Sequence, residues 1–288
     1  MTATAAPAKT AAPAKRASLT RRTVIDRILL YGAAIFLAAW TLVPIYLIAV
    51  AAFSKSLSVY DFPKSFLPTQ FSTETMSFFV NSSGVLGSVK NSIIVALGTI
   101  VLSLAIGAPA GYALARFRFP GRDMFHLAVL SSKMFPIAIL SIPLAVAFIG
   151  LGLYDTLLGV VIIHSAMVLP FVVIVTSGVF YSVSRELEEA AMTLGTSRFG
   201  AFMRVALPLA LPGLAAAAIF AFVSSWNEVF AATILTVRER TLPAHILATL
   251  NQSPLYFKFA GGFFMIIPSL FFIFFMRKYL FNLWGPGR

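Results

Sequence analysis

Long apolar runs alternate with shorter polar segments along most of this chain. An α-helix needs about 20 consecutive apolar residues to cross the hydrocarbon core of a bilayer. Several of the runs contain proline or glycine, which membrane helices tolerate where they bend or pack closely. The pattern therefore predicts an all-α, polytopic membrane protein with six transmembrane helices, at about residues 28–53, 91–114, 125–149, 157–180, 209–235 and 260–280.

The other segments divide the chain into a tail and one membrane domain. Residues 1–24 are rich in Ala, Pro, Thr, Lys and Arg. A segment of that composition cannot bury a core, so we expect a disordered basic tail. Residues 25–288 would then form a single transmembrane domain, with its longer polar loops at residues 54–88 and 236–258.

The polar insert between the fourth and fifth spans, residues 186–212, has the pattern of two short helices joined by a turn. Ser184 precedes a run of glutamates, and serine followed by acidic residues is typical of a helix N-terminus. Gly195 is expected to end this first helix, because glycine adopts a left-handed conformation without a Cβ penalty. A second amphipathic helix is predicted at about residues 197–205, ended by the prolines that follow it.

Composition and charge place the protein in a membrane and orient it there. Hydrophobic residues make up 59% of the chain and charged residues only 11%, compared with about 25% charged in soluble proteins. The basic residues lie at the ends of spans and not in a patch interleaved with aromatics, which argues against nucleic-acid binding. A cytoplasmic N-terminus puts fifteen Lys and Arg inside and six outside, as the positive-inside rule requires. Both termini and the polar insert are then cytoplasmic.

The residues that usually hold metals or nucleotides are sparse. The chain has no cysteine, and its histidines, His126, His164 and His245, have no metal-ligand spacing. The phosphate-binding loop G-x-x-x-x-G-K-[ST] does not occur. We therefore expect this chain to bind no cofactor.

The polar insert resembles the coupling motif of ABC importer permeases, which reads E-A-A, three residues, G, nine residues, an aliphatic residue, one residue, L-P. In that family the loop docks into a cleft of a cytoplasmic ATPase, where two alanines allow close backbone approach and the glutamate meets a basic partner. The alternative is an ordinary interfacial helix between two spans. The matching residues are Glu189, Ala190, Ala191, Gly195, Val205, Leu207 and Pro208.

Further short motifs resemble the shorter, six-span subunit of maltose-type sugar permeases. They are Asn91-Ser92, Tyr112 to Arg116, Phe119-Pro120-Gly121, Met134-Phe135-Pro136, Leu169-Pro170-Phe171 and Trp226-Asn227-Glu228. Three features depart from that family: Ser184 stands where Pro is usual, Thr193-Leu194 replaces Ile-Asp, and residues 282–288 lack the usual Gly- and Lys-containing ending. The first two leave the coupling role standing, whereas the third puts contacts between the C-terminal tail and the ATPase in doubt.

Polar residues within the predicted spans are candidates for a substrate path, because such groups are costly in lipid and usually face a bundle interior or a cavity. A Trp ring can stack on a sugar, and Asn and Glu can bind its hydroxyls, so we expect the 226–228 triplet to face a second permease. Each candidate also has a structural alternative: a helix cap for Asn91, a hydrogen-bonded core position for His164 and helix-to-helix ties for the triplet. The candidates are Trp226, Asn227, Glu228, Asn91 and His164.

The resemblance implies a permease subunit of a binding-protein-dependent ABC importer for a carbohydrate, in the cytoplasmic (inner) membrane of a prokaryote. ATP and Mg²⁺ would be bound by two separate ATPase subunits. A second permease would enclose the path with this chain, and an extracytoplasmic binding protein would deliver substrate to the loops at 54–88 and 236–258. Import of a non-carbohydrate solute stays open, as does a membrane enzyme, which would need a nucleophile–base pair or a metal site within the spans. A channel or secondary transporter would leave the coupling motif unexplained.

Overall fold

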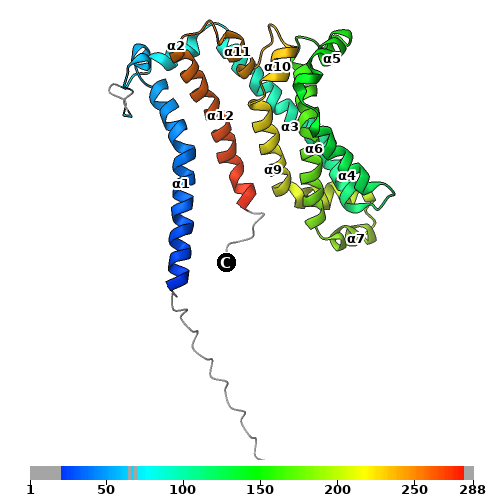
Figure 1. Ribbon diagram of the computed structural model, residues 1–288. Helices are drawn as coiled ribbons and strands as arrows, with labels where there is room; N and C mark the ends of the chain where they lie inside the picture. Colours follow the sequence, from blue (N-terminus) through cyan, green and yellow to red (C-terminus); the bar gives the residue numbers. More distant parts are fainter. Residues whose placement is uncertain (1–20, 64–65, 68–70, 282–288) are drawn as a thin grey trace, which may run out of the picture. The chain divides into compact units, whose positions relative to one another are not determined.

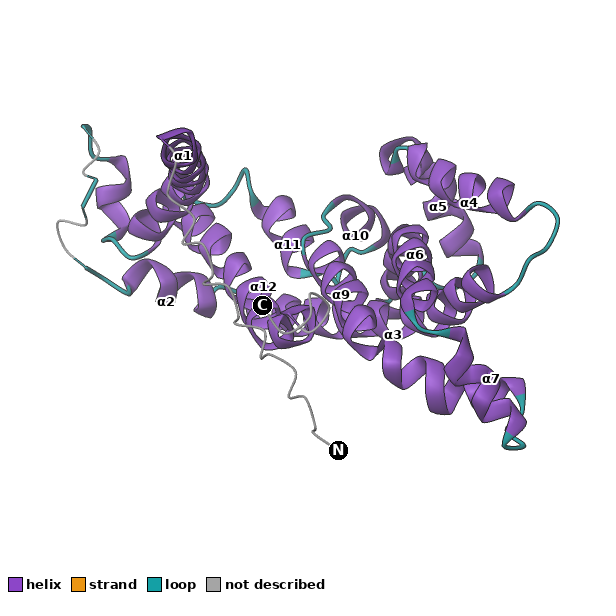
Figure 2. Cartoon of the chain, turned by 90° about the horizontal axis from the view of Figure 1, so that it is seen from below, coloured by secondary structure: helices purple, strands orange, loops and turns teal. Residues whose placement is uncertain are grey.

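The computed structural model describes residues 21–63, 66–67 and 71–281 (Figure 1). This part of the chain is helical apart from its connections and one antiparallel bridge between Ser54 and Phe71 (Figure 2). Short 3₁₀ turns lie at Ser56–Tyr60 and Ser132–Met134, and a π-helical turn lies at Phe202–Ala206. The helices are α1 (Arg21–Ala52), α2 (Glu74–Asn81), α3 (Val85–Arg116), α4 (Arg122–Ser131), α5 (Ile137–Gly150), α6 (Leu157–Ser182), α7 (Arg185–Thr193), α8 (Arg198–Ala201), α9 (Leu207–Trp226), α10 (Phe230–Leu235), α11 (Leu242–Thr249) and α12 (Leu255–Phe281).

The predicted fold class is confirmed. Five segments are long and apolar enough to cross a membrane: Ile25–Ala52, Val85–Arg116, Leu157–Ser182, Arg198–Trp226 and Leu255–Met276. The pair α4 and α5 passes the same test together and would make a sixth span, but it bends by 91° at its break. The protein is therefore an all-α, multi-pass membrane protein.

Two of the predicted spans are not continuous helices. The segment 125–149 breaks before Pro136, because proline pushes the preceding Phe135 out of the helical region, and Phe135 indeed has extended angles (φ −78°, ψ 113°). The segment 209–235 breaks after Trp226, where α9 ends, and resumes as the short helix α10. Apolar composition alone does not reveal either break.

The two ends of the chain also differ from the expectation. Helix α1 begins at Arg21, so residues 21–24 are not part of a disordered tail. Residues 1–20 and 282–288, which carry the rest of the predicted tail and the unusual C-terminal ending, lie outside the described residues. The chain divides into two units, residues 1–47, which hold most of α1, and residues 48–288, which hold the remaining helices.

The second unit is built on close packing between α3 and α6. Thr176 Oγ1 on α6 donates a hydrogen bond of 2.9 Å to the backbone carbonyl of Gly107 on α3. A Cβ atom on Gly111 would lie 2.7 Å from the backbone nitrogen of Ser177. Glycine is required at 111 because the two backbones approach too closely for any side chain, as is common where membrane helices meet at small residues.

Helix α9 packs against both α3 and α6, and α12 packs on α9. Within this unit α2, α10 and α11 lie at one end of the bundle and α7 at the other (Figure 1). The aromatic core at the α2 and α11 end gathers Phe79, Phe222, Trp226, Leu242 and Phe257. The helices thus hold the 186–212 insert and the 226–228 triplet at different places in one packed unit.

Candidate functional site

Helix α7 begins and ends as the sequence predicts. Ser184 Oγ accepts a hydrogen bond of 3.2 Å from a backbone N–H of the first turn. At the other end Gly195 has a φ of +89°. The N–H groups of Gly195 and Thr196 donate to the carbonyls of Met192 at 3.0 Å and Ala191 at 3.1 Å. This Schellman ending satisfies the last carbonyls of the helix, so the glycine fixes the direction in which the chain leaves α7.

The second half of the motif differs from the prediction. Ser197 Oγ caps α8 by accepting from a backbone N–H at 3.1 Å, but no separate helix ends near Val205. The chain instead runs through the π-helical turn Phe202–Ala206 directly into α9. Pro208 closely follows the π-helical turn, so its missing N–H falls where the regular hydrogen-bond ladder is already altered. The prolines therefore do not end the motif, and Val205, Leu207 and Pro208 form its continuous passage into a transmembrane helix.

The residues of the E-A-A triplet are unequally exposed. Glu189 and Ala190 are exposed, whereas Ala191 is half-buried. Leu194 stands beside the turn with 87% of its surface exposed. The free end of α7 is thus a rigid tip that carries a carboxylate, a small residue and one large apolar side chain.

Trp226 does not lie on an open surface. Its side chain is 0% exposed and its Nε1 donates to the Met265 carbonyl at 2.9 Å. The expectation that the whole triplet faces a second subunit is therefore wrong for this residue, because the indole is enclosed by its own chain. Asn227 is exposed, and it lines a groove between α9 and α12 together with Ser269. It is the member of the triplet that reaches the surface.

Glu228 belongs to a buried polar chain that joins three long helices. Its Oε2 lies 3.0 Å from His164 Nε2, and His164 Nδ1 lies 2.8 Å from Ser225 Oγ. Ser225 Oγ in turn donates to Thr99 Oγ1 at 3.3 Å. The Glu228 carboxylate also accepts from the N–H groups of Ala231 at 2.9 Å and Ala232 at 3.1 Å. The Glu228 side chain thus satisfies N–H groups in the first turn of α10, whose N-cap residue is Val229, and it does not lie within a continuous span.

This chain of groups has the composition of a Ser-His-Glu catalytic triad, which bears on the enzyme alternative. Ser225 is buried and His164 is 1% exposed. Neither the cavity beside α7 nor the groove between α9 and α12 is lined by any of these residues. A nucleophile needs room beside it for the atom that it attacks. The arrangement therefore supports the structural alternative for His164, a hydrogen-bonded core position.

Asn91 is not a helix cap. Helix α3 begins at Val85, so Asn91 lies nearly two turns inside it. Its Nδ2 donates to Glu239 Oε2 at 3.1 Å and to the Arg240 carbonyl at 3.3 Å. The prediction failed because the polar residues before Asn91 suggest a loop, whereas the helix extends through them. Asn91 instead fastens the loop between α10 and α11 to α3.

Comparison with known proteins identifies the family to which the chain belongs. Residues 104–282, which include α7, the turn and α9, match the family model described as "Binding-protein-dependent transport system inner membrane component". The chain belongs to this family. It is a permease component of ABC transport systems.

Individual relatives support the same assignment. The permease is 33% identical over 221 residues to the probable ABC transporter permease protein YurM of Bacillus subtilis, and the alignment covers 73% of each chain. It is 32% identical over 187 residues to the diacetylchitobiose uptake system permease protein NgcG of Streptomyces coelicolor, covering 65% of this chain and 62% of that one. A solved bacterial ABC transporter involved in the import of the acidic polysaccharide alginate contains a chain that superposes with a TM-score of 0.73 at 25% identity, covering 91% of this chain and 98% of that one.

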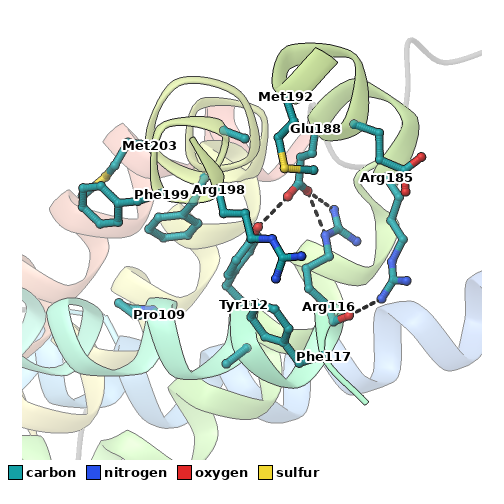
Figure 3. A pocket seen from close by; sticks show the side chains of 14 residues that line it. Pro109, Tyr112, Arg116, Phe117, Arg185, Glu188, Met192, Arg198, Phe199 and Met203 are labelled. Atoms are coloured by element: carbon teal, nitrogen blue, oxygen red, sulfur yellow. Dashed lines mark hydrogen bonds and ion pairs between the residues drawn. The ribbon is translucent and has the colours of Figure 1, made fainter. Parts of the chain in front are cut away.

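Glu188 anchors the motif in the permease, and the sequence analysis singled out only its neighbour Glu189. The Glu188 carboxylate accepts from Tyr112 OH at 2.6 Å and from Arg116 Nε at 2.8 Å, and it forms an ion pair with Arg116 at 2.6 Å (Figure 3). The Arg116 and Glu188 side chains are only 8% and 7% exposed. Tyr112 and Arg116 are four residues apart, on one face of α3, and both belong to the Tyr112 to Arg116 motif. That spacing was a signal that the end of α3 binds a carboxylate.

Further hydrogen bonds to backbone carbonyls hold α7 against the end of α3. Arg116 donates to the carbonyl of Val183 at 2.8 Å. Arg185 donates to the carbonyls of Ala115 and Arg116. Both guanidinium groups therefore satisfy carbonyls near helix ends, which otherwise lack partners. The base of α7 is fixed while its tip stays free.

Asp155 organises the loop after α10, and nothing in the sequence pattern singled it out. It has a φ of +55°, and its Oδ1 accepts from the N–H groups of Val237 at 2.8 Å, Arg238 at 2.8 Å and Glu239 at 3.1 Å. Burial by itself would raise the pKa of the Asp155 carboxyl, but these three N–H donors and the nearby charge of Arg238 hold the pKa below its ordinary value of 3.8. The loop is thus anchored to α6 through Asp155 and to α3 through Asn91.

Proposed function

We propose that the permease imports a carbohydrate as one membrane subunit of an ABC importer, driven by ATP that separate subunits hydrolyse. The observation that carries this proposal is the rigid tip of α7, set by the Gly195 turn and continuous with the transmembrane helix α9. The carbohydrate cargo is supported by the diacetylchitobiose and alginate systems to which the chain is similar. A panel of labelled sugars and non-sugar solutes, tested for uptake, distinguishes this cargo from another solute.

The proposed assembly contains a second permease, two ATPase subunits that bind ATP and Mg²⁺, and an extracytoplasmic binding protein. The family's dependence on a binding protein supports the last of these. Both termini and α7 lie in the cytoplasm in this proposal, because fifteen Lys and Arg are then inside and six outside. The loop held by Asp155 and Asn91 would then face the binding protein.

The geometry suggests how an ATPase could move the membrane helices. The ATPase would bind the tip of α7 through Glu189, Ala190 and Leu194, which are exposed. A displacement of the tip would reach α3 through the Glu188–Arg116 ion pair. It would reach α9 through the unbroken passage from α8. One docking contact would therefore move the adjacent ends of two packed spans together.

Two substitutions test this coupling contact. Ala190 lies about 200° around α7 from Glu188, so Ala190→Trp should block docking without disturbing the anchor. Gly195→Val should redirect the turn, because a β-branched residue resists a positive φ. In each case we expect uptake and substrate-stimulated ATP hydrolysis by the purified complex to fall at least tenfold, while membrane insertion is unchanged. Tyr181→Trp, at an exposed site at the end of α6, is the control. Normal hydrolysis by both variants would refute the coupling role.

For the substrate path we propose Asn227 in place of Trp226. Asn227 lines the groove between α9 and α12, and its Nδ2 donates to the Val223 carbonyl at 2.8 Å, which leaves its carbonyl oxygen available. Asn227→Ala should raise the sugar concentration needed for half-maximal uptake about tenfold, the usual scale for one lost polar contact. Leu270→Ala, which trims another groove residue without a polar group, is the comparison. Equal effects of the two changes would make the groove a packing surface only.

A further inference from the structure

A cavity of about 590 Å³ lies between α3 and the α7–α8 motif, and Ala190 is not among its lining residues (Figure 3). The side chains that line it are apolar on one side and basic on the other. Pro109, Phe199 and Met203 lie toward one side, and the side chains of Arg185 and Arg116 lie toward the other. The cavity therefore has an apolar part and a cationic part, as a site for an amphipathic anion requires.

The cationic part contains one guanidinium that the protein does not use. Arg116 is engaged by Glu188 and Arg185 by backbone carbonyls. Arg198 reaches from α8 toward Tyr112 and Arg116 (Figure 3), and its side chain makes no hydrogen bond or ion pair with any residue that the structure describes. The lining holds three arginines against two carboxylates, those of Glu188 and Glu189, so its net charge is positive, and with Glu188 paired to Arg116 the guanidinium of Arg198 favours an anion in the cavity.

The depth of the cavity decides between a soluble and a membrane ligand. Arg116 is the last residue of one candidate span and Arg198 the first residue of another, and α3 is longer than the hydrocarbon core of about 30 Å, so the cationic part lies in the headgroup region. Pro109 lies seven residues earlier on α3, which at a rise of 1.5 Å per residue is about 10 Å along the helix toward the hydrocarbon core. A phospholipid joins these two levels, because its phosphate lies in the headgroup region and its acyl chains begin at the edge of the hydrocarbon core.

We propose that this cavity binds one anionic phospholipid. Its phosphate pairs with Arg198 and lies within the field of Arg116 and Arg185. One acyl chain extends past Ala113 and Pro109 toward the hydrocarbon core. The inference rests on the membrane placement of the chain and not on the proposed cargo. A lipid held here contacts α3, α7 and α8 at once, so it stabilises the base of α7 while the tip stays free for a partner.

The experiment is native mass spectrometry of the full-length permease in detergent, titrated with phosphatidylglycerol, with phosphatidylcholine of the same acyl chains, or with inorganic phosphate. We expect one phosphatidylglycerol to bind preferentially. Arg198→Gln should weaken that binding about fivefold, the effect expected for one basic residue beside an anionic headgroup. Arg204→Gln, which removes an exposed arginine outside the cavity, should leave it unchanged.

A second variant tests the acyl-chain part. Ala113→Phe fills the apolar part of the cavity. It should abolish binding of phosphatidylglycerol without affecting any weak binding of phosphate. Equal retention of both lipids, or no effect of Arg198→Gln, overturns the proposal. Binding of phosphate as tight as that of phosphatidylglycerol, unaffected by Ala113→Phe, would make this a free-anion site. Stoichiometric displacement of the lipid by added ATPase would make the cavity part of the ATPase contact instead.

Discussion

The buried ion pair between Glu188 and Arg116 allows stability and coupling to be tested separately on α7. Glu188 holds the helix in place, whereas its exposed neighbour Glu189 is proposed to bind the ATPase. Glu188→Gln keeps the shape of the side chain but removes its charge; its oxygen can still accept from Arg116, while its amide N–H faces the Tyr112 hydroxyl, which would have to accept. Both side chains are less than a tenth exposed, so the guanidinium is left buried without its counter-charge. Breaking one side of a buried pair costs about 3–5 kcal/mol. The effect should be local to α7 and the end of α3.

The measurement is thermal unfolding of the purified permease in detergent, where Glu188→Gln should lower the midpoint by several degrees. Glu189→Gln is the matched control, because this exposed neighbour should change stability by less than about 0.5 kcal/mol. A double-mutant cycle of Glu188→Leu with Arg116→Met identifies the cause. Replacing both charges removes the unpaired group, so the Glu188→Leu and Arg116→Met double variant should be more stable than the sum of the single changes predicts.

At equal folded fraction, ATPase binding should be weakened more by Glu189→Gln than by Glu188→Gln, which is the reverse of their order in stability. Glu189→Gln should weaken ATPase binding with little loss of stability, whereas Glu188→Gln should lose coupling in proportion to its loss of structure. Additive single and double variants, or a Glu188→Gln protein as stable as Glu189→Gln, would refute the reasoning from the buried pair.

Two further predictions follow from the packing and from the outer loop. Gly111→Ala should destabilise the permease by about 1–3 kcal/mol, because the added methyl meets the backbone of α6 at Thr176, whereas Gly178→Ala, which meets nothing within 4 Å, should be neutral or slightly stabilising in thermal unfolding. Asp155→Ala should destabilise the loop after α10 at neutral pH, as measured by hydrogen exchange of the loop. Because the folded pKa of Asp155 is lowered, the difference in stability from wild type should persist above about pH 4. It should vanish as the pH falls through the folded pKa. Asp155→Asn keeps an acceptor at a positive φ and should be milder; an effect equal to that of alanine would contradict the assigned hydrogen bonds.

The sequence by itself determined the features that depend on neighbouring residues. Burying about 20 apolar residues in lipid requires a helix whatever its partners are, so the fold class followed from composition and spacing. The cap at Ser184 and the turn at Gly195 were equally predictable, because an N-cap and a left-handed ending involve only backbone groups a few residues away. The resemblance to ABC importer permeases rested on the same local stretch and led to the family.

Only the tertiary structure decided which polar side chains act where. Glu188 and Glu189 are adjacent acids in the sequence, and what distinguishes them is that α3, 72 residues away in the chain, brings Arg116 to one of them. Asn91 was expected to cap its own helix and Glu228 either to face a second permease or to tie helices together, and the sequence could name no partner for either. Their hydrogen bonds reach Glu239 and His164, 148 and 64 residues away. Such contacts are fixed by how the helices pack, and packing depends on small residues such as Gly111, whose requirement shows only when the opposing backbone is in place.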